Sequence, residues 1–120
     1  MIDSPMLPAR FSVRSNVSLT QDVFELNLEP IEETSCSFAP GQFSMLYLFG
    51  MGEVPISISG DPEKRHSFVY TIRSVGTVTR ALSTLQPGEM VGGRGPYGNP
   101  WPIEVAKGKD LVLVAGGIGL

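Results

Sequence analysis

The sequence predicts an all-β domain of antiparallel strands, with many turns and one short helix. Its 120 residues are 42% hydrophobic, which is enough for one domain to bury a core without disulfide or metal cross-links. The fourteen glycines and ten prolines are more than a helical protein usually carries, and they divide the chain into short segments. Within several of these segments apolar residues alternate with polar ones, which is the period of half-buried strands.

The alternation gives the approximate positions of the strands. It is found at Phe11 and Val13, at Phe24, Leu26 and Leu28, at Ile56 and Ile58, and at Phe68, Tyr70 and Ile72. Turn sequences separate these runs, among them Ala39-Pro40-Gly41, Gly50-Met51-Gly52 and Gln86-Pro87-Gly88. The spacing is typical of a meander or a Greek key.

One segment has helical periodicity instead. Val78, Ala81, Leu82 and Leu85 recur at i, i+3, i+4 and i+7, so we expect a short helix with one apolar face that stops before Pro87-Gly88. A helix inserted among strands either closes an open end of the barrel or contributes to a functional site, and the pattern fits both equally.

The C-terminal segment differs from the rest of the chain. Residues 111–114 are all apolar, and the glycine-rich sequence Ala115-Gly116-Gly117-Ile118-Gly119 follows them. A strand that is apolar on both faces requires neighbouring strands and covering helices, as in a doubly wound sheet. We therefore expect residues 1–105 to form the β-barrel domain and residues 106–120 to begin a truncated second domain of the α/β class.

Composition excludes several functions. A net charge of -3 without a block of basic residues argues against a nucleic-acid partner. No apolar run is long enough to cross a membrane, and the N-terminus lacks the pattern of a signal peptide. The single cysteine, Cys36, cannot form an intrachain disulfide, so we expect a cytoplasmic protein with an exposed, inert thiol. There is no metal-ligand spacing, catalytic triad or carboxylate pair.

Two segments have features of a ligand site. Gly76, Thr77 and Thr79 lie where a strand gives way to the expected helix, and the unpaired N–H groups at such a point bind phosphate or pyrophosphate. A threonine there is as often an ordinary helix cap. The strand through Pro55, Ile56 and Ser57 places hydroxyl groups beside apolar residues. This combination suits a flat heterocycle with a polar edge. Taken by itself, the segment fits an edge strand with solvent-facing serines better.

Five motifs occur together in a characteristic order. They are Pro40-Gly41-Gln42-Phe43, Pro55-Ile56-Ser57-Ile58, Gly76-Thr77-Val78-Thr79, Gly95-Pro96-Tyr97-Gly98 and Gly116-Gly117-Ile118-Gly119. This order resembles the ferredoxin-NADP reductase superfamily over nearly the whole chain from about Phe11. Within it, the chain is similar to the electron-transfer subunits of dihydroorotate dehydrogenase and anaerobic sulfite reductase and to the gamma subunit of sulfur-reducing hydrogenases. The resemblance implies a six-stranded antiparallel Greek-key barrel that binds FAD.

The resemblance also implies roles for particular residues. Pro55, Ile56 and Ser57 would line the isoalloxazine ring, with the Ser57 hydroxyl near its reactive N5 atom. The backbone of Tyr70, Thr71 and Ile72 would contact the ring or the ribityl chain. Three further residues would hold the pyrophosphate: Gly76, Val78 and Thr79. Tyr97 and Trp101 are open to two interpretations, and packing at a domain junction is favoured over stacking on the cofactor.

Two positions depart from the family pattern. The family arginine that pairs with the pyrophosphate falls at Val54, and the aromatic residue that stacks on the flavin falls at Ile56. Loss of a charged phosphate contact typically costs about 1.5–3 kcal/mol, so we expect FAD to bind weakly enough to be lost on purification. Arg73 or Arg80 could supply the missing charge, and the sequence does not choose between them.

In the family, electrons pass from NAD(P)H through FAD to a partner redox subunit. The turn at Gly116, Gly117 and Gly119 resembles the start of the NAD(P)-binding site, but the helix that completes such a site is absent. We therefore expect the 120 residues alone to be inactive, with an iron–sulfur cluster possible beyond them. The alternative function is a cofactor-free barrel that serves as a docking or regulatory module in a multi-subunit reductase.

Overall fold

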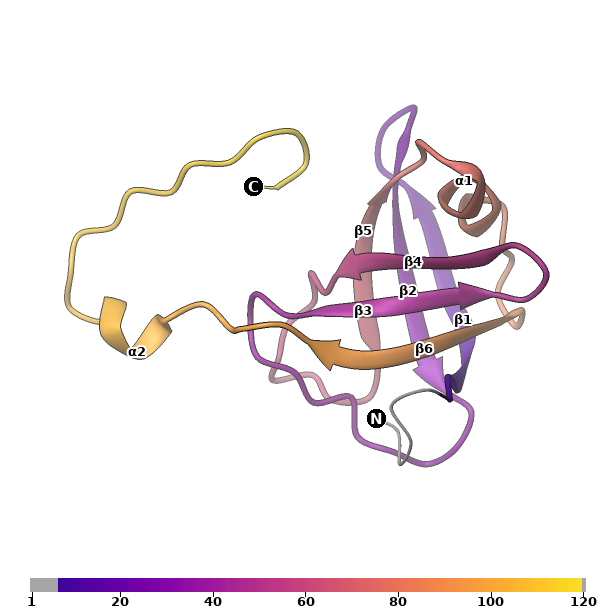
Figure 1. Ribbon diagram of the computed structural model, residues 1–120, viewed down its shortest axis with the longest axis horizontal. Coiled ribbons are helices and arrows are strands. Elements are labelled where there is room, and N and C mark those ends of the chain that lie inside the picture. Colours follow the sequence, from indigo (N-terminus) through magenta and orange to yellow (C-terminus); the bar gives the residue numbers. More distant parts are fainter. Residues whose placement is uncertain (1–6, 120) are drawn as a thin grey trace.

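The computed structural model describes residues 7–119, which form a curved sheet, two short helices and an extended C-terminal segment (Figure 1). The sheet has six strands: β1 (Ala9–Ser18), β2 (Val23–Pro30), β3 (Phe43–Leu48), β4 (Gly52–Ser57), β5 (Phe68–Arg73) and β6 (Met90–Tyr97). The helices are α1 (Thr77–Ser83) and α2 (Ile103–Ala106). The predicted all-β class with one short helix is confirmed, and α2 is an addition to it.

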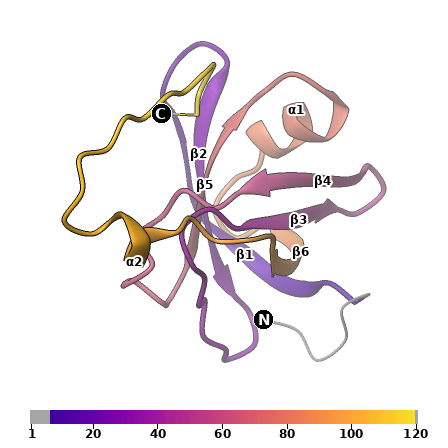
Figure 2. The same cartoon turned by 60° about the vertical axis from the view of Figure 1, so that its left-hand side comes forward.

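All strand pairs are antiparallel, in the order β4-β3-β6-β1-β2-β5. β6 lies between β1 and β3, so the chain returns from the far edge of the sheet to its middle. The two edge strands approach each other through a single bridge between Ile58 and Tyr70. The sheet is therefore curled (Figure 2), but within residues 7–119 β4 and β5 share no ladder beyond this bridge, so the barrel is not fully closed.

The inward faces of the strands form one core. The alternating residues predicted from the sequence are buried in β1, β2 and β5, and Leu46 of β3 and Val91 of β6 join them. Tyr70 is 1% exposed and its hydroxyl donates a hydrogen bond to Ser44 Oγ at 3.0 Å. These two buried hydroxyls are thus paired with each other, as burial favours.

Helix α1 lies over the open end of the barrel, and its apolar face is buried as predicted. Leu82 is fully buried and Leu85 nearly so, while Val78 packs against the core. The helix ends at Ser83, earlier than Pro87-Gly88, because other groups bond its last carbonyls. The Asn16 side-chain amide of β1 donates to the carbonyls of Leu82, Ser83 and Leu85 at 3.0–3.3 Å.

The predicted strand at residues 111–114 does not form. After α2 the chain runs away from the sheet and curves back toward the end of β5, and all side chains from 107 to 119 are exposed (Figure 1). Val112 and Val114 are 90% and 93% exposed. The segment lacks ladder hydrogen bonds because no strand lies beside it within residues 7–119, and a strand needs such a partner.

Cys36 also differs from the expectation of an exposed thiol. It is fully buried, and burial raises the pKa of its thiol to about 11.

Neither helix in the described part of the chain is long and apolar enough to span a bilayer.

Candidate functional site

A groove of about 670 Å³ opens at the end of the barrel between β4 and β5. One wall is formed by β4 and the residues after it, another by the end of β5 and the loop before α1. The remaining wall comes from Trp101 and from the glycine-rich C-terminal turn. Its lining residues are Gly41, Val54, Pro55, Ile56, Ser57, Ile58, Ser59, Thr71, Ile72, Arg73, Val75, Thr79, Trp101, Ile118 and Gly119.

An ion pair on the outer face of the sheet fixes the position of β4. Arg94 of β6 donates to the carboxylate of Glu53 through Nε at 2.8 Å and through Nη2 at 2.7 Å. The two side chains reach across β3, and Arg94 lowers the pKa of the Glu53 carboxyl. This fork-shaped pair ties the edge strand of the groove to the middle of the sheet.

The groove has an apolar wall with hydroxyl groups along it. Val54 and Ile56 pack against the core, whereas Pro55 and Ser57 alternate with them and are exposed. The Ser57 hydroxyl has no hydrogen-bond partner within residues 7–119. It is therefore available to a ligand.

Two further hydroxyls face each other across the gap between the edge strands. Ser59 Oγ and Thr71 Oγ1 are 3.0 Å apart, and Ser59 Oγ also donates to the Val69 carbonyl at 3.3 Å. A flat, partly polar ring fits such a surface, because its faces need apolar contact and its edges need hydrogen-bond partners.

The loop before α1 uses its own threonine as a cap. Thr79 Oγ1 accepts hydrogen bonds from the backbone N–H groups of Val75 and Gly76 at 3.0 and 2.9 Å. The sequence allowed two roles for a threonine here, helix capping and phosphate binding, and Thr79 has the capping role. Two of the N–H groups at this turn are consequently occupied within the protein.

Among the described residues that line the groove, Arg73 at the end of β5 is the only charged one. Its Nε lies 3.7 Å from Asp22 Oδ2, and both side chains are about half exposed. Arg80, the other cation considered from the sequence, lies on the exposed side of α1 and does not line the groove.

The structure brings most of the sequence-predicted site residues together. The lining includes Pro55, Ile56, Ser57, Thr71, Ile72, Thr79 and Gly119. It does not include Tyr70, whose side chain points into the core, or Gly76, Val78, Gly116 and Gly117. The predicted roles of these residues are proposals, since a lining position is not evidence of binding.

Trp101 and Ser59 are the main residues that the sequence analysis did not assign to the groove. Tyr97 packs against Phe43 with ring centroids 5.8 Å apart, whereas Trp101 is 69% exposed and faces the groove. The backbone N–H of Trp101 donates to the Pro40 carbonyl at 2.8 Å, which holds the segment after β6 beside the Pro40-Gly41-Gln42-Phe43 motif. Ser59 follows directly after Ile58 in the predicted strand, but no pattern distinguished it from an ordinary exposed serine.

No protein-family profile matches the chain. Individual proteins match most of it in sequence. The gamma subunit of sulfhydrogenase 1 from Pyrococcus furiosus is 41% identical over 98% of this chain. The probable dihydroorotate dehydrogenase B (NAD(+)) electron transfer subunit of Methanopyrus kandleri is 36% identical over the whole chain. The chain spans 41% and 42% of the lengths of these two relatives.

Solved structures confirm the fold. The flavohem-like FAD/NAD binding domain of nitric oxide dioxygenase from Vibrio cholerae matches with a TM-score of 0.69 at 18% identity, over 78% of this chain and 45% of that one. Ferredoxin reductases and related reductase domains match similarly. The groove between β4 and β5 thus lies in a domain with the same fold as these reductase domains.

Proposed function

From the homology of this chain with sulfhydrogenase gamma subunits and the electron-transfer subunits of dihydroorotate dehydrogenase B, we propose that it forms the flavin-binding part of an oxidoreductase. In the parent protein, electrons would pass between NAD(P)H and a partner redox subunit through FAD. The observation that carries the proposal is the groove, which combines an apolar wall, four hydroxyl side chains and one cation among the described residues that line it.

The groove suits the chemical parts of FAD. Its volume lies in the range of cofactor pockets, and it contains apolar surface for a ring, hydroxyls for polar edges and a guanidinium for phosphate. When bound, the flavin supplies the hydride and electron chemistry, and the protein supplies binding and orientation. A fully polar ligand would not fit as well, because the partly exposed Val54 and Ile56 side chains would have no apolar surface to contact.

Individual residues would divide this task. Pro55 and Ile56 provide apolar contact for the ring, and the unpaired Ser57 hydroxyl hydrogen-bonds its N5 edge. The backbone and hydroxyl of Thr71 approach the ring or the ribityl chain. The backbone near Gly76 and Val78 approaches the phosphates, while Thr79 holds that loop in place.

The remaining parts of the parent protein are proposed by homology. The turn at Gly116, Gly117 and Gly119 would begin an NAD(P)-binding domain after a barrel of residues 1–105, and the relatives' names imply a partner subunit. A free buried cysteine agrees with a reducing, cytoplasmic location.

A flavin titration tests the proposal. We expect FAD fluorescence to be quenched when the 120-residue chain is added, with saturation at micromolar concentrations. Ser57→Ala should weaken binding or shift the flavin absorption bands, since one hydrogen bond to the ring is lost. Ser18→Ala removes an exposed hydroxyl at the end of β1 that does not line the groove, so it is the matched control and should change neither.

The second candidate function is a cofactor-free docking or regulatory barrel. Val54 and Ile56 favour it, because they pack against the core where the family has an arginine and an aromatic residue. Unchanged fluorescence of both FAD and FMN at high protein concentration would support this module and exclude the flavin barrel.

A further inference from the structure

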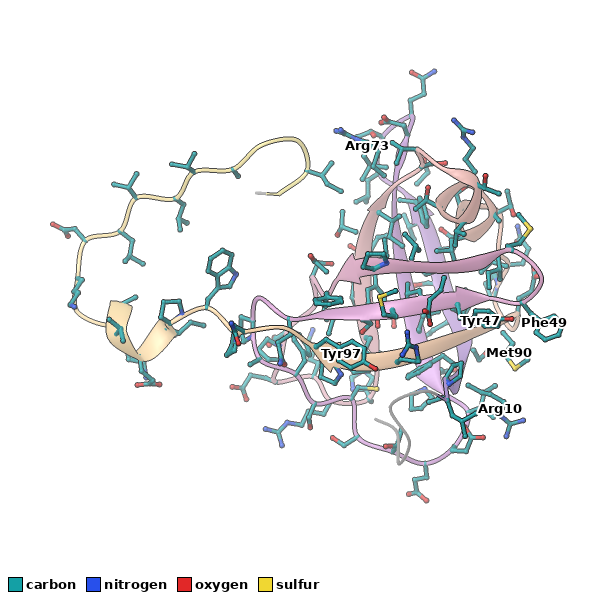
Figure 3. All side chains as sticks on the ribbon, in the orientation of Figure 1. Arg10, Tyr47, Phe49, Arg73, Met90 and Tyr97 are labelled. Atoms are coloured by element: carbon teal, nitrogen blue, oxygen red, sulfur yellow. The ribbon has the colours of Figure 1, made fainter. Side chains whose placement is uncertain are left out.

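The charge distribution of the groove is uneven. Of the residues that line it, only Arg73 is charged, and no carboxylate is among them. Figure 3 shows Arg73 projecting from the end of β5 toward the C-terminal segment. The guanidinium lies beside the glycine-rich turn, since a Cβ on Gly117 would be 3.7 Å from Arg73 Nη1. Any anionic group of a ligand in this groove would be attracted to this point.

The backbone near α1 is a weaker candidate for that anion. The helix has only seven residues, so its dipole is small, and the N–H groups of Val75 and Gly76 already donate to Thr79 Oγ1. On the opposite wall, Val54 is apolar and packs against the core. A cation is therefore present on β5 and absent from β4.

The existing partner of Arg73 does not prevent this role. Asp22 is 3.7 Å from Nε, beyond normal hydrogen-bond length, and both side chains are about half exposed. Exposed pairs of this kind contribute little to stability, so the guanidinium can turn to a ligand at small cost. Arg73 also presents two Nη atoms, which can contact two oxygens of a pyrophosphate in parallel.

We propose that Arg73 binds the pyrophosphate of FAD, and that it replaces from β5 the cation that β4 lacks. This inference rests on the proposed flavin function. Its consequence is selectivity, because a groove whose only charge meets the phosphates should prefer FAD to riboflavin, which has the same ring without phosphate.

The test compares FAD with riboflavin on the 120-residue chain by fluorescence titration. We expect FAD to bind more tightly than riboflavin, and Arg73→Ala to weaken FAD about 10- to 100-fold while riboflavin affinity stays constant. Arg73→Lys should recover part of the loss. Arg80→Ala removes the same charge from the exposed face of α1 and is the matched control, with no change expected for either ligand. Asp22→Asn should raise the affinity for FAD and leave the affinity for riboflavin unchanged, because it removes the carboxylate that competes for Arg73.

The outcomes separate the two proposals. If neither flavin is quenched by the wild-type chain, the flavin function fails and the role of Arg73 fails with it. If FAD binds but riboflavin binds equally well, or if Arg80→Ala costs as much as Arg73→Ala, the flavin function stands and the role of Arg73 is refuted. The comparison of FAD with riboflavin uses the wild-type chain alone. Equal affinities would therefore refute the role of Arg73 even if Arg73→Ala does not fold.

Discussion

At the scale of single residues, the hydrogen bond between Tyr70 and Ser44 is the main polar contact of the core. Both side chains are at most 1% exposed, and the bond of 3.0 Å joins β5 to β3 across the barrel interior. Neither hydroxyl can turn to water when its partner is lost. Removing one of them therefore leaves a buried polar group unsatisfied.

Tyr70→Phe should consequently lower the free energy of unfolding by about 1–3 kcal/mol, measured by urea denaturation. The double variant Tyr70→Phe/Ser44→Ala is the control, because it removes both partners and should recover part of the loss. Equal stability of the single variant and the wild type would show that the bond contributes nothing.

Two buried groups give the molecule an alkaline sensitivity. Burial raises the pKa of Cys36 from 9.0 to about 11, and it also raises the pKa of Tyr70. Both groups ionise more readily in the unfolded chain. The stability from keeping them neutral is present below about pH 9 and is lost as the pH rises toward 11 and above.

We expect the urea midpoint to be constant near neutral pH and to fall between pH 9 and pH 11. Cys36→Ala should flatten this fall, although it lowers stability at all pH values by leaving a cavity. A midpoint that stays constant to pH 11 in the wild type would contradict the buried thiol. Slow reaction of the native thiol with iodoacetamide at pH 8 provides an independent check.

At the scale of elements, the strands that the sequence predicted are those with one buried face and one solvent-exposed face. β1, β2 and β5 alternate because most of their outer residues are polar, with Val17 and Val69 as exceptions. β3 was not located by alternation, since its outward residues Met45 and Tyr47 are apolar too. β6 is rich in glycine, a composition typical of turns. In the sheet, a Cβ at Gly92 would lie 3.0 Å from Pro8 Cβ and 3.3 Å from Tyr47 Cβ, so glycine avoids crowding there.

Helix α1 depends on an element far away in the sequence. The Asn16 amide bonds three carbonyls at its C-terminal end, an arrangement that helical periodicity alone does not reveal. Asn16→Ala should destabilise the protein by about 1–2 kcal/mol, because these carbonyls lose their donor. Thermal unfolding measures the loss, and Ser18→Ala on the same strand should have no such effect. An unchanged melting temperature for Asn16→Ala would show that water replaces the amide.

At the scale of the whole molecule, the core and the C-terminal segment are separate. Every buried hydrophobic residue of the described chain lies between Phe11 and Val91. The segment 107–119 contributes none, although Ile118 and Gly119 line the groove. The apolar sequence at 111–114 predicted a strand, and none forms there, because no other strand lies beside this segment within residues 7–119.

Deleting residues 107–120 should therefore leave the barrel almost as stable as before. We expect the free energy of unfolding to change by less than about 0.5 kcal/mol, as for surface changes that leave the core intact. Leu82→Ala in the full chain is the positive control in the urea assay. Truncating this fully buried leucine should lower the free energy of unfolding by about 2–5 kcal/mol. FAD affinity should fall in the shortened chain, since one wall of the groove is removed. A shortened chain that unfolds as readily as Leu82→Ala would mean that the segment packs on the barrel and that the groove wall is part of the core.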